Sequence, residues 1–134
     1  MSVELRDSMC FGCSPQNPIG LKLKFIHDGD ICRSYFTGSR EHEGWPGIMH
    51  GGLLTTLLDE VMAQWLYERD IMAMTVEINV KFSKPVPIGQ QFAVEGKQES
   101  KKGRLIVLEG QVLLSDGTVA TKATAKFIQV KNSI

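Results

Sequence analysis

One stretch of the sequence, residues 47–67, constrains the fold more than any other. It holds a glycine pair, Gly51 and Gly52, followed by the only long apolar segment without a helix breaker. We predict one helix from Leu53 to about Glu68, with a length of about 24 Å. Nearly every position in it is apolar or small, so we expect it to be buried on all sides. It is too short and too interrupted by polar residues to span a bilayer.

Two features of this predicted helix are hard to explain by packing alone. Gly51 and Gly52 would let a ligand approach the backbone, where the first N–H groups lack intrahelical partners and can stabilise negative charge. A tight turn that needs positive φ explains the pair as well. Asp59 lies in the middle of the apolar segment, where a carboxylate is costly unless it is paired or used. The alternative is a small wet face around Asp59 or Glu60.

Length and charge limit the classes of partner. The chain has 134 residues, and we expect one domain over residues 1–134. Its 15 basic and 15 acidic residues cancel, which gives no electrostatic reason to expect nucleic acid or an anionic membrane as a partner. Residues 1–12 lack the basic and apolar regions of a signal peptide. We therefore expect a cytoplasmic protein that binds neither nucleic acid nor membrane.

The three cysteines, Cys10, Cys13 and Cys32, do not indicate a disulfide framework. Cys10 and Cys13 have the spacing of a metal knuckle, but no second pair follows, and no strand-then-helix context suggests a redox pair. His27 and His42 could complete a zinc site with Cys32. We predict instead that the protein has no metal site and no cofactor, and that the first two cysteines pack in an N-terminal turn.

Alternating apolar and polar residues predict strands on both sides of the helix. The predicted strands span residues 21–26, 31–37, 73–82, 91–99, 104–114 and 118–130, with hairpin turns at 28–30, 100–103 and 115–117. One apolar helix must be covered by one sheet. We therefore predict an α+β fold in which a curved antiparallel sheet of about six strands wraps a central buried helix. The edge strands of such a sheet favour dimerisation.

A set of motifs spread over nearly the whole chain matches a known family. These motifs are His50-Gly51-Gly52, Asp59-Glu60, Thr75, Asn79-Val80-Lys81-Phe82, Pro85 and Gly89, preceded by Cys10-Phe11-Gly12-Cys13 and Asn17-Pro18-Ile19-Gly20-Leu21. The chain resembles the hotdog-fold acyl-CoA thioesterases, and most of all their phenylacetate-degradation-type branch. The resemblance implies a hotdog fold and hydrolysis of an acyl-CoA substrate without a cofactor.

The resemblance also implies roles for individual residues. The N–H of Gly51 would polarise the thioester carbonyl, Asp59 would act as general base or nucleophile, and the Thr75 hydroxyl would help to hold the water. His50 is another candidate for the general base, but we expect its side chain to orient the glycine turn instead. Many relatives carry an Asn in the loop before the histidine, whereas this chain has none there and Glu43 is the candidate to replace it.

Three basic residues, Lys101, Lys102 and Arg104, cluster at a predicted hairpin and could contact the phosphates of CoA, as the same hairpin does in some relatives. A solvated turn is an equally good explanation. Gly51 and Asp59 are eight residues apart, which separates their backbones by roughly 12 Å along a helix. One chain could not easily supply both groups to one thioester. We therefore predict a homodimer with shared active sites, and the resemblance implies that such dimers often pair into tetramers.

Three other functions fit parts of the same pattern. Residues 42–47 resemble the loop of acyl-carrier-protein dehydratases, but those enzymes place a Glu on the helix soon afterwards, and residues 53–57 contain no acid. A non-enzymatic acyl-CoA-binding regulator is a second alternative, although known examples carry an added DNA-binding helix pair for which this chain has no room. A partner-binding scaffold with a vestigial site stays open. The missing acid favours hydrolysis over dehydration or hydration.

Overall fold

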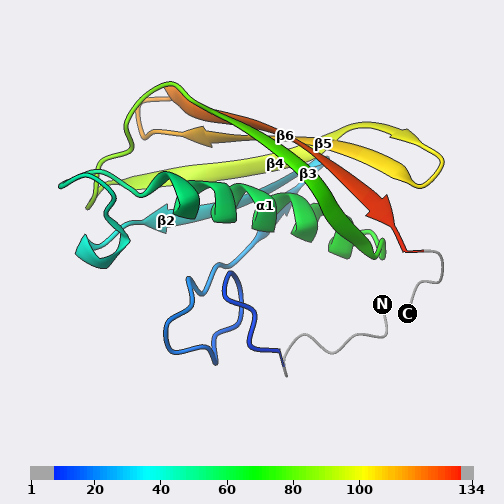
Figure 1. Ribbon diagram of the computed structural model, residues 1–134, viewed down its shortest axis with the longest axis horizontal. Helices are drawn as coiled ribbons and strands as arrows, with labels where there is room; N and C mark the ends of the chain where they lie inside the picture. The colour runs from blue at the N-terminus through cyan, green and yellow to red at the C-terminus, as the bar shows by residue number, and fades with distance from the viewer. Residues whose placement is uncertain (1–7, 131–134) are drawn as a thin grey trace.

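The computed structural model describes residues 8–130. Within this range one long helix lies across one face of a six-stranded antiparallel sheet (Figure 1). The elements are β1 (Ile26–Asp28), β2 (Ile31–Thr37), the short 3-10 helix η2 (Arg40–His42), α1 (Gly51–Glu68), β3 (Ala73–Phe82), β4 (Gln91–Lys102), β5 (Leu105–Leu113) and β6 (Val119–Gln129). The predicted order of one helix after two strands and before four is therefore confirmed.

The sheet order, β1-β2-β4-β5-β6-β3, places β3 at one edge. Helix α1 lies between β2 and β3 in the chain, so the connection that contains it passes from the second strand of the sheet to the opposite edge. β3 pairs with β6 along one side only, and within the described residues its other side has no neighbouring strand. An unpaired edge of this length leaves a row of backbone N–H and C=O groups available for pairing with a second chain.

The core lies between α1 and the sheet. One side of the helix is buried, and its residues recur at helical spacing: Leu54, Leu57, Leu58, Val61, Met62, Trp65 and Leu66. Gly96 of β4 and Gly110 of β5 pair with each other beneath the helix. A Cβ on Gly96 would lie 3.1 Å from Met62, and a Cβ on Gly110 would lie 3.1 Å from Leu58. The absence of side chains at these two positions therefore lets the helix pack close to the sheet.

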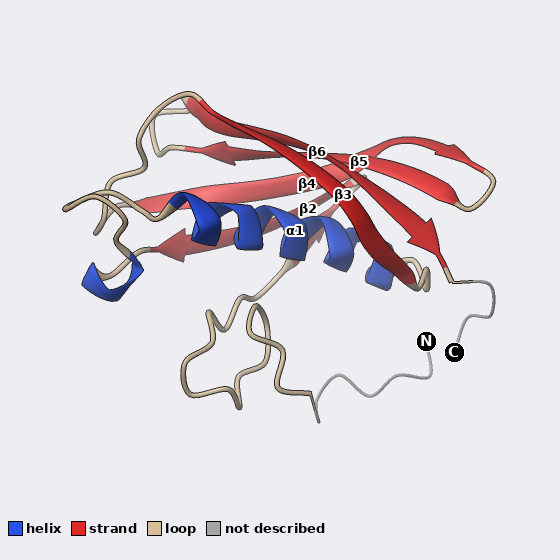
Figure 2. Cartoon of the chain, viewed as in Figure 1, coloured by secondary structure: helices blue, strands red, loops and turns tan. Residues whose placement is uncertain are grey.

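The opposite side of α1 is only half-buried, and this side carries Asp59, Glu60 and Ala63. The prediction that the helix is buried on every side is therefore wrong for this chain by itself. The described residues before β1 form loops and turns (Figure 2). This segment contacts α1 through the Cys10 thiol and the Glu60 carboxylate. The carboxylate of Asp59 consequently does not lie in a closed apolar core, which agrees with the wet face considered from the sequence.

The predicted first strand, residues 21–26, is wrong. Leu21 and Leu23 are buried as their alternation suggests, but Lys22 between them has φ 54°, which interrupts extended backbone. The N–H groups of these two leucines bond to the carbonyl groups of Phe11 and Gly12 in the N-terminal loop instead of to a strand. The pairing with β2 begins only at Ile26.

The predicted turn at residues 100–103 is also displaced. β4 continues through Lys102, and the turn consists of Gly103, which has φ 62°, and Arg104. A register shift between Gln98 and Ser100 marks a bulge, and β4 extends three residues beyond the predicted end at residue 99. Among the described helices, none is both long enough and apolar enough to cross a membrane.

Candidate active site

The start of α1 is held by the residue immediately before it. His50 has extended backbone dihedral angles (φ −63°, ψ 131°), and its Nδ1 accepts a 2.9 Å hydrogen bond from the N–H of Gly52. A neutral histidine whose Nδ1 accepts carries its proton on Nε2. The side chain thus caps the helix, which agrees with the orienting role expected from the sequence.

Because of this cap, the N–H groups of the two glycines differ in their hydrogen bonding. The N–H of Gly52 is occupied by His50, whereas the N–H of Gly51 has no hydrogen-bond partner among residues 8–130. Gly51 is therefore the glycine that can offer a donor at the positive end of the helix dipole. A Cβ at Gly51 would lie 3.5 Å from the ring of Phe82, an ordinary contact, while a Cβ at Gly52 would lie only 3.0 Å from the His50 ring.

The loop before the helix is closed by its own hydrogen bonds. The Glu43 carboxylate accepts a 2.7 Å hydrogen bond from the N–H of Gly47, and Gly44 donates to the carbonyl of Ile48 at 2.9 Å. Gly47 has φ 81°, a conformation that favours glycine. Glu43, the candidate to replace the Asn of many relatives, thus has a partner within its own loop. One of its carboxylate oxygens stabilises the turn at Gly47.

Asp59 and Thr75 are brought together. The Thr75 hydroxyl donates a 2.8 Å hydrogen bond to Oδ1 of Asp59. Asp59 lies in the middle of α1 and Thr75 on the edge strand β3, next to a bulge that leaves Val76 without an opposite residue on β6. Bulges change the direction of nearby side chains. The two residues are 16 positions apart in the chain, and the crossing of β3 over α1 makes them neighbours.

The remaining predicted residues are not gathered around Asp59. Gly51 and Asp59 lie on the same helix, roughly 12 Å apart along its axis. Lys101, Lys102 and Arg104 are exposed at the β4–β5 hairpin, which lies at the end of the sheet opposite the start of α1 (Figure 1). One chain therefore presents the parts of the predicted site separately: a donor, a carboxylate and a basic hairpin.

Two hollows in the surface lie away from these groups. One, of about 250 Å³, is lined by residues of β2, β4, β5 and β6, among them the ion-paired Lys97 and Glu109. The other, of about 390 Å³, lies near Tyr35 and Leu113. Gly51, Asp59 and Thr75 line neither of them.

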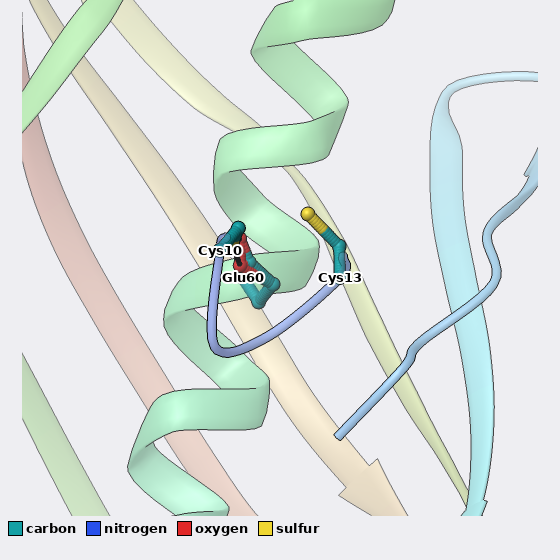
Figure 3. Close-up of side chains that lie close together, drawn as sticks. All are labelled: Cys10, Cys13 and Glu60. Carbon is teal, nitrogen blue, oxygen red and sulfur yellow. Dashed lines mark hydrogen bonds between the residues drawn. The ribbon is translucent and has the colours of Figure 1, made fainter. Parts of the chain in front are cut away.

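A cluster that the sequence did not predict lies next to Asp59. The Sγ atom of Cys10 is 3.5 Å from Oε1 and 3.6 Å from Oε2 of Glu60, and the thiol of Cys13 is close by (Figure 3). Burial raises the pKa of Glu60. Burial, with a contribution from Cys10 and Glu60, raises the pKa of Cys13 to about 12. The expectation that the two cysteines simply pack in a turn overlooked this carboxylate.

The alternative zinc site considered from the sequence is not assembled. Cys32 is fully buried in the core, the Nε2 atom of His27 lies 3.6 Å from a carboxylate oxygen of Glu68, and the Nδ1 atom of His42 accepts from the N–H of Ser39 at 2.9 Å. His27 and Cys32 lie opposite each other on the β1–β2 hairpin, whereas His42 lies in η2, and within residues 8–130 the three side chains do not form a group with metal-binding spacing.

Comparison with known proteins finds similarity to the thioesterase superfamily. A family model described as the thioesterase superfamily matches residues 46–121, which include Gly51, Asp59 and Thr75. The acyl-coenzyme A thioesterase THEM4 of Rattus norvegicus is 29% identical over 96 residues, 71% of this chain and 41% of that protein. The Xenopus laevis protein of the same name is 30% identical over 89 residues, 66% of this chain and 40% of the relative. The chain thus spans less than half the length of these curated relatives.

Solved structures share the fold. A thioesterase superfamily protein superposes with a TM-score of 0.85 at 25% identity, covering 92% of this chain and 63% of that one. The Escherichia coli PaaI protein gives 0.78 at 16% identity, covering 85% and 83%. A hypothetical thioesterase protein of Streptococcus pneumoniae, solved with coenzyme A, gives 0.75 at 16% identity, covering 81% and 85%. The predicted hotdog fold is confirmed.

Proposed function

The chain belongs to the thioesterase superfamily, and from this premise we propose that it hydrolyses an acyl-CoA thioester to a free acid and CoA. The curated relatives named acyl-coenzyme A thioesterases and the solved neighbour that holds coenzyme A support this substrate class. The observation that carries the proposal is the hydrogen bond from Thr75 to Asp59. It holds a carboxylate in a fixed orientation on a helix whose first N–H has no hydrogen-bond partner among residues 8–130.

In the proposed reaction, Asp59 acts as the general base. It takes a proton from a water molecule as the water oxygen attacks the thioester carbon. The resulting oxyanion accepts a hydrogen bond from the N–H of Gly51, which also lies at the positive end of the helix dipole. The tetrahedral intermediate then expels the CoA thiolate, which takes up the proton. A carboxylate that attacks the carbonyl directly is the alternative, with water hydrolysing the acyl-enzyme in a second step.

We propose that each active site is built by two subunits. A donor to the carbonyl oxygen and a base for the attacking water must both lie within about 3 Å of their partners. The separation of about 12 Å between Gly51 and Asp59 along one helix is too large for this. A two-fold axis can bring Gly51 of one protomer next to Asp59 of the other. Within the described residues the outer edge of β3 has no neighbouring strand, and with the exposed Met74 and Val76 it supports a dimer interface there.

The basic hairpin is the proposed contact for the phosphates of CoA. Lys101, Lys102 and Arg104 are exposed, and they lie at the end of the chain's sheet remote from the start of its own α1. Contact with the same substrate as Gly51 would therefore again need groups from two protomers. The family resemblance further suggests that dimers pair into tetramers.

The direct test is release of free thiol from a panel of short, medium, long and aryl acyl-CoAs. We expect turnover by the wild-type protein, and a loss on the order of 10²–10⁴ in rate for Asp59→Asn, because the amide cannot accept the proton. Glu68→Gln is the matched control, since Glu68 is an exposed carboxylate at the end of the same helix. Circular dichroism of each variant checks folding.

Two results would contradict the proposal at different levels. A folded wild-type protein that hydrolyses none of the panel is not an acyl-CoA thioesterase. A folded Asp59→Asn variant that retains the wild-type rate hydrolyses acyl-CoA by a mechanism in which Asp59 is not the base.

A further inference from the structure

The cluster of Cys10, Cys13 and Glu60 lies outside the proposed hydrolysis. Its two cysteines precede the part of the chain that matches the thioesterase family, residues 46–121. Its carboxylate comes from α1, 50 positions after Cys10. The N-terminal loop lies against the half-buried side of the helix, so that all three side chains meet (Figure 3).

We propose that Cys10, Cys13 and Glu60 bind one zinc ion, which fastens the N-terminal loop to α1. One ligand atom from each side chain, two thiol sulfurs and a carboxylate oxygen, lies within 4.8 Å of the other two. Tetrahedral zinc with Zn–S bonds of about 2.3 Å and Zn–O bonds of about 2.0 Å places sulfur and oxygen ligands about 3.5 Å apart. The separation between Cys10 Sγ and Glu60 Oε1 is 3.5 Å.

The type of ligand favours zinc over the common hard cations. Magnesium and calcium select sites made of oxygen atoms, whereas thiolates select softer ions. Two thiolates, one carboxylate and a water molecule would complete four-coordinate zinc. Binding releases the two thiol protons, and the ion then neutralises two of the three negative charges in the cluster.

The Glu60 carboxylate has only a weak partner within residues 8–130, which favours binding of a cation. Within residues 8–130, the Glu60 carboxylate accepts its hydrogen bond from the thiol of Cys10. No lysine, arginine or histidine in this range forms an ion pair with Glu60. A thiol is a weak donor. A half-buried carboxylate normally has a stronger partner.

The loop that supplies the thiols is held in place by its own backbone. Ser14 donates to the carbonyl of Cys10 at 3.0 Å, while Leu21 donates to Phe11 at 2.7 Å and Leu23 to Gly12 at 3.0 Å. Gly12 lies directly over Glu60, and a Cβ at this position would overlap the carboxylate. The glycine therefore permits the close approach that brings both cysteines to one carboxylate.

The experiment uses the full-length chain, purified with a thiol reductant and treated with a chelator. Cobalt(II) serves as a spectroscopic probe, because thiolate coordination gives an intense near-ultraviolet band that carboxylate coordination alone does not. Zinc is then added to displace the cobalt. We expect one cobalt per chain, the thiolate band, and loss of the band with one equivalent of zinc.

Variants assign the ligands. The Cys10→Ser/Cys13→Ser double variant keeps Cys32 and should lose the band entirely. Glu60→Gln should keep thiolate character but bind zinc more weakly by at least about tenfold. Glu68→Gln removes a carboxylate from the same helix without touching the cluster and should bind like the wild-type protein. Zinc should also protect Cys10 of the wild-type chain from alkylation, a test that does not depend on how any variant folds.

Three outcomes would overturn the zinc site. They are the absence of stoichiometric binding by the reduced wild-type chain, an unchanged band in the double cysteine variant, and equal zinc affinity of Glu60→Gln and wild type. Binding is read without reference to turnover, so this result is independent of whether the chain hydrolyses acyl-CoA.

Discussion

The hydroxyl of Thr75 donates a 2.8 Å hydrogen bond to Oδ1 of Asp59, which links the edge strand β3 to the middle of α1. The bond fixes one carboxylate oxygen, while Oδ2 has no hydrogen-bond partner among the described residues. A base positioned in this way loses little rotational freedom when it meets the water molecule. The relationship therefore makes Thr75 a positioning residue for Asp59 in the proposed reaction.

Replacing Thr75 with valine should lower kcat/KM roughly 10- to 100-fold. A hydrogen bond to a charged group contributes about 1.5–3 kcal/mol, and about 1.4 kcal/mol corresponds to a factor of ten in rate. Thr75→Ser, which keeps the hydroxyl, should recover most of the activity. Thiol-release kinetics of both variants measure the difference. Equal activity of the valine and serine variants would show that the hydroxyl is not used.

Replacing Gly51 with proline should lower kcat by about 10²–10³, the usual cost of removing one oxyanion donor. Proline is well tolerated at the first position of a helix. His50 already has the extended backbone that a residue before proline prefers (ψ 131°). The substitution thus removes the N–H with little effect on the helix.

Gly51→Ala is the control for that substitution. It keeps the N–H and places a Cβ at ordinary contact distance, 3.5 Å, from Phe82. We expect turnover close to that of the wild-type protein, measured by the same thiol release with circular dichroism as the folding check. A folded proline variant with wild-type kcat would remove Gly51 from the oxyanion site.

The parts of the fold that follow local patterns could be predicted, and the parts set by distant contacts could not. Helix α1 begins two residues before the predicted start because His50 caps Gly52 through its side chain. The alternation of Leu21 and Leu23 correctly indicated burial. It wrongly indicated a strand, because hydrogen bonds to the N-terminal loop, with positive φ at Lys22, decide the backbone there.

The candidate site likewise has residues that could be predicted from the sequence and contacts that could not. The family resemblance implied a base at Asp59 and a water-holding hydroxyl at Thr75, and the structure places these two side chains in contact. The contact of Cys10 and Cys13 with Glu60 was missed, because no local pattern tells where an N-terminal loop lies against a helix 50 positions later. A second carboxylate beside Asp59 on an apolar helix was the available signal.

Thr121→Val should stabilise the protein by about 1 kcal/mol. Thr121 is fully buried, and within residues 8–130 its hydroxyl has no hydrogen-bond partner. A buried polar group without a partner costs roughly 1–3 kcal/mol, and valine removes it with little change in shape. Urea unfolding with an unchanged m-value gives the difference in the free energy of unfolding.

Ser34→Ala is the opposite test. The Ser34 hydroxyl is also fully buried, but it donates a 2.6 Å hydrogen bond to the carbonyl of Lys24. Its removal should lower the free energy of unfolding by about 1 kcal/mol. If Thr121→Val destabilises the protein as Ser34→Ala does, the Thr121 hydroxyl has a partner in solution.

Sharing of active sites between two subunits can be tested with mixed dimers. Gly51→Pro and Asp59→Asn chains with different affinity tags are co-expressed, and the mixed dimers are isolated through both tags. If each site takes its donor from one protomer and its base from the other, a mixed dimer has one site with both defects and one with neither. An isologous dimer has two equivalent sites, so we expect about half of the wild-type activity per dimer. If each site were built by one chain, every site in the mixed dimer would be defective, and the activity would stay as low as in the parent variants. Confirmed mixed dimers without recovered activity, or a wild-type monomer that turns over at the full rate, would rule out the shared site.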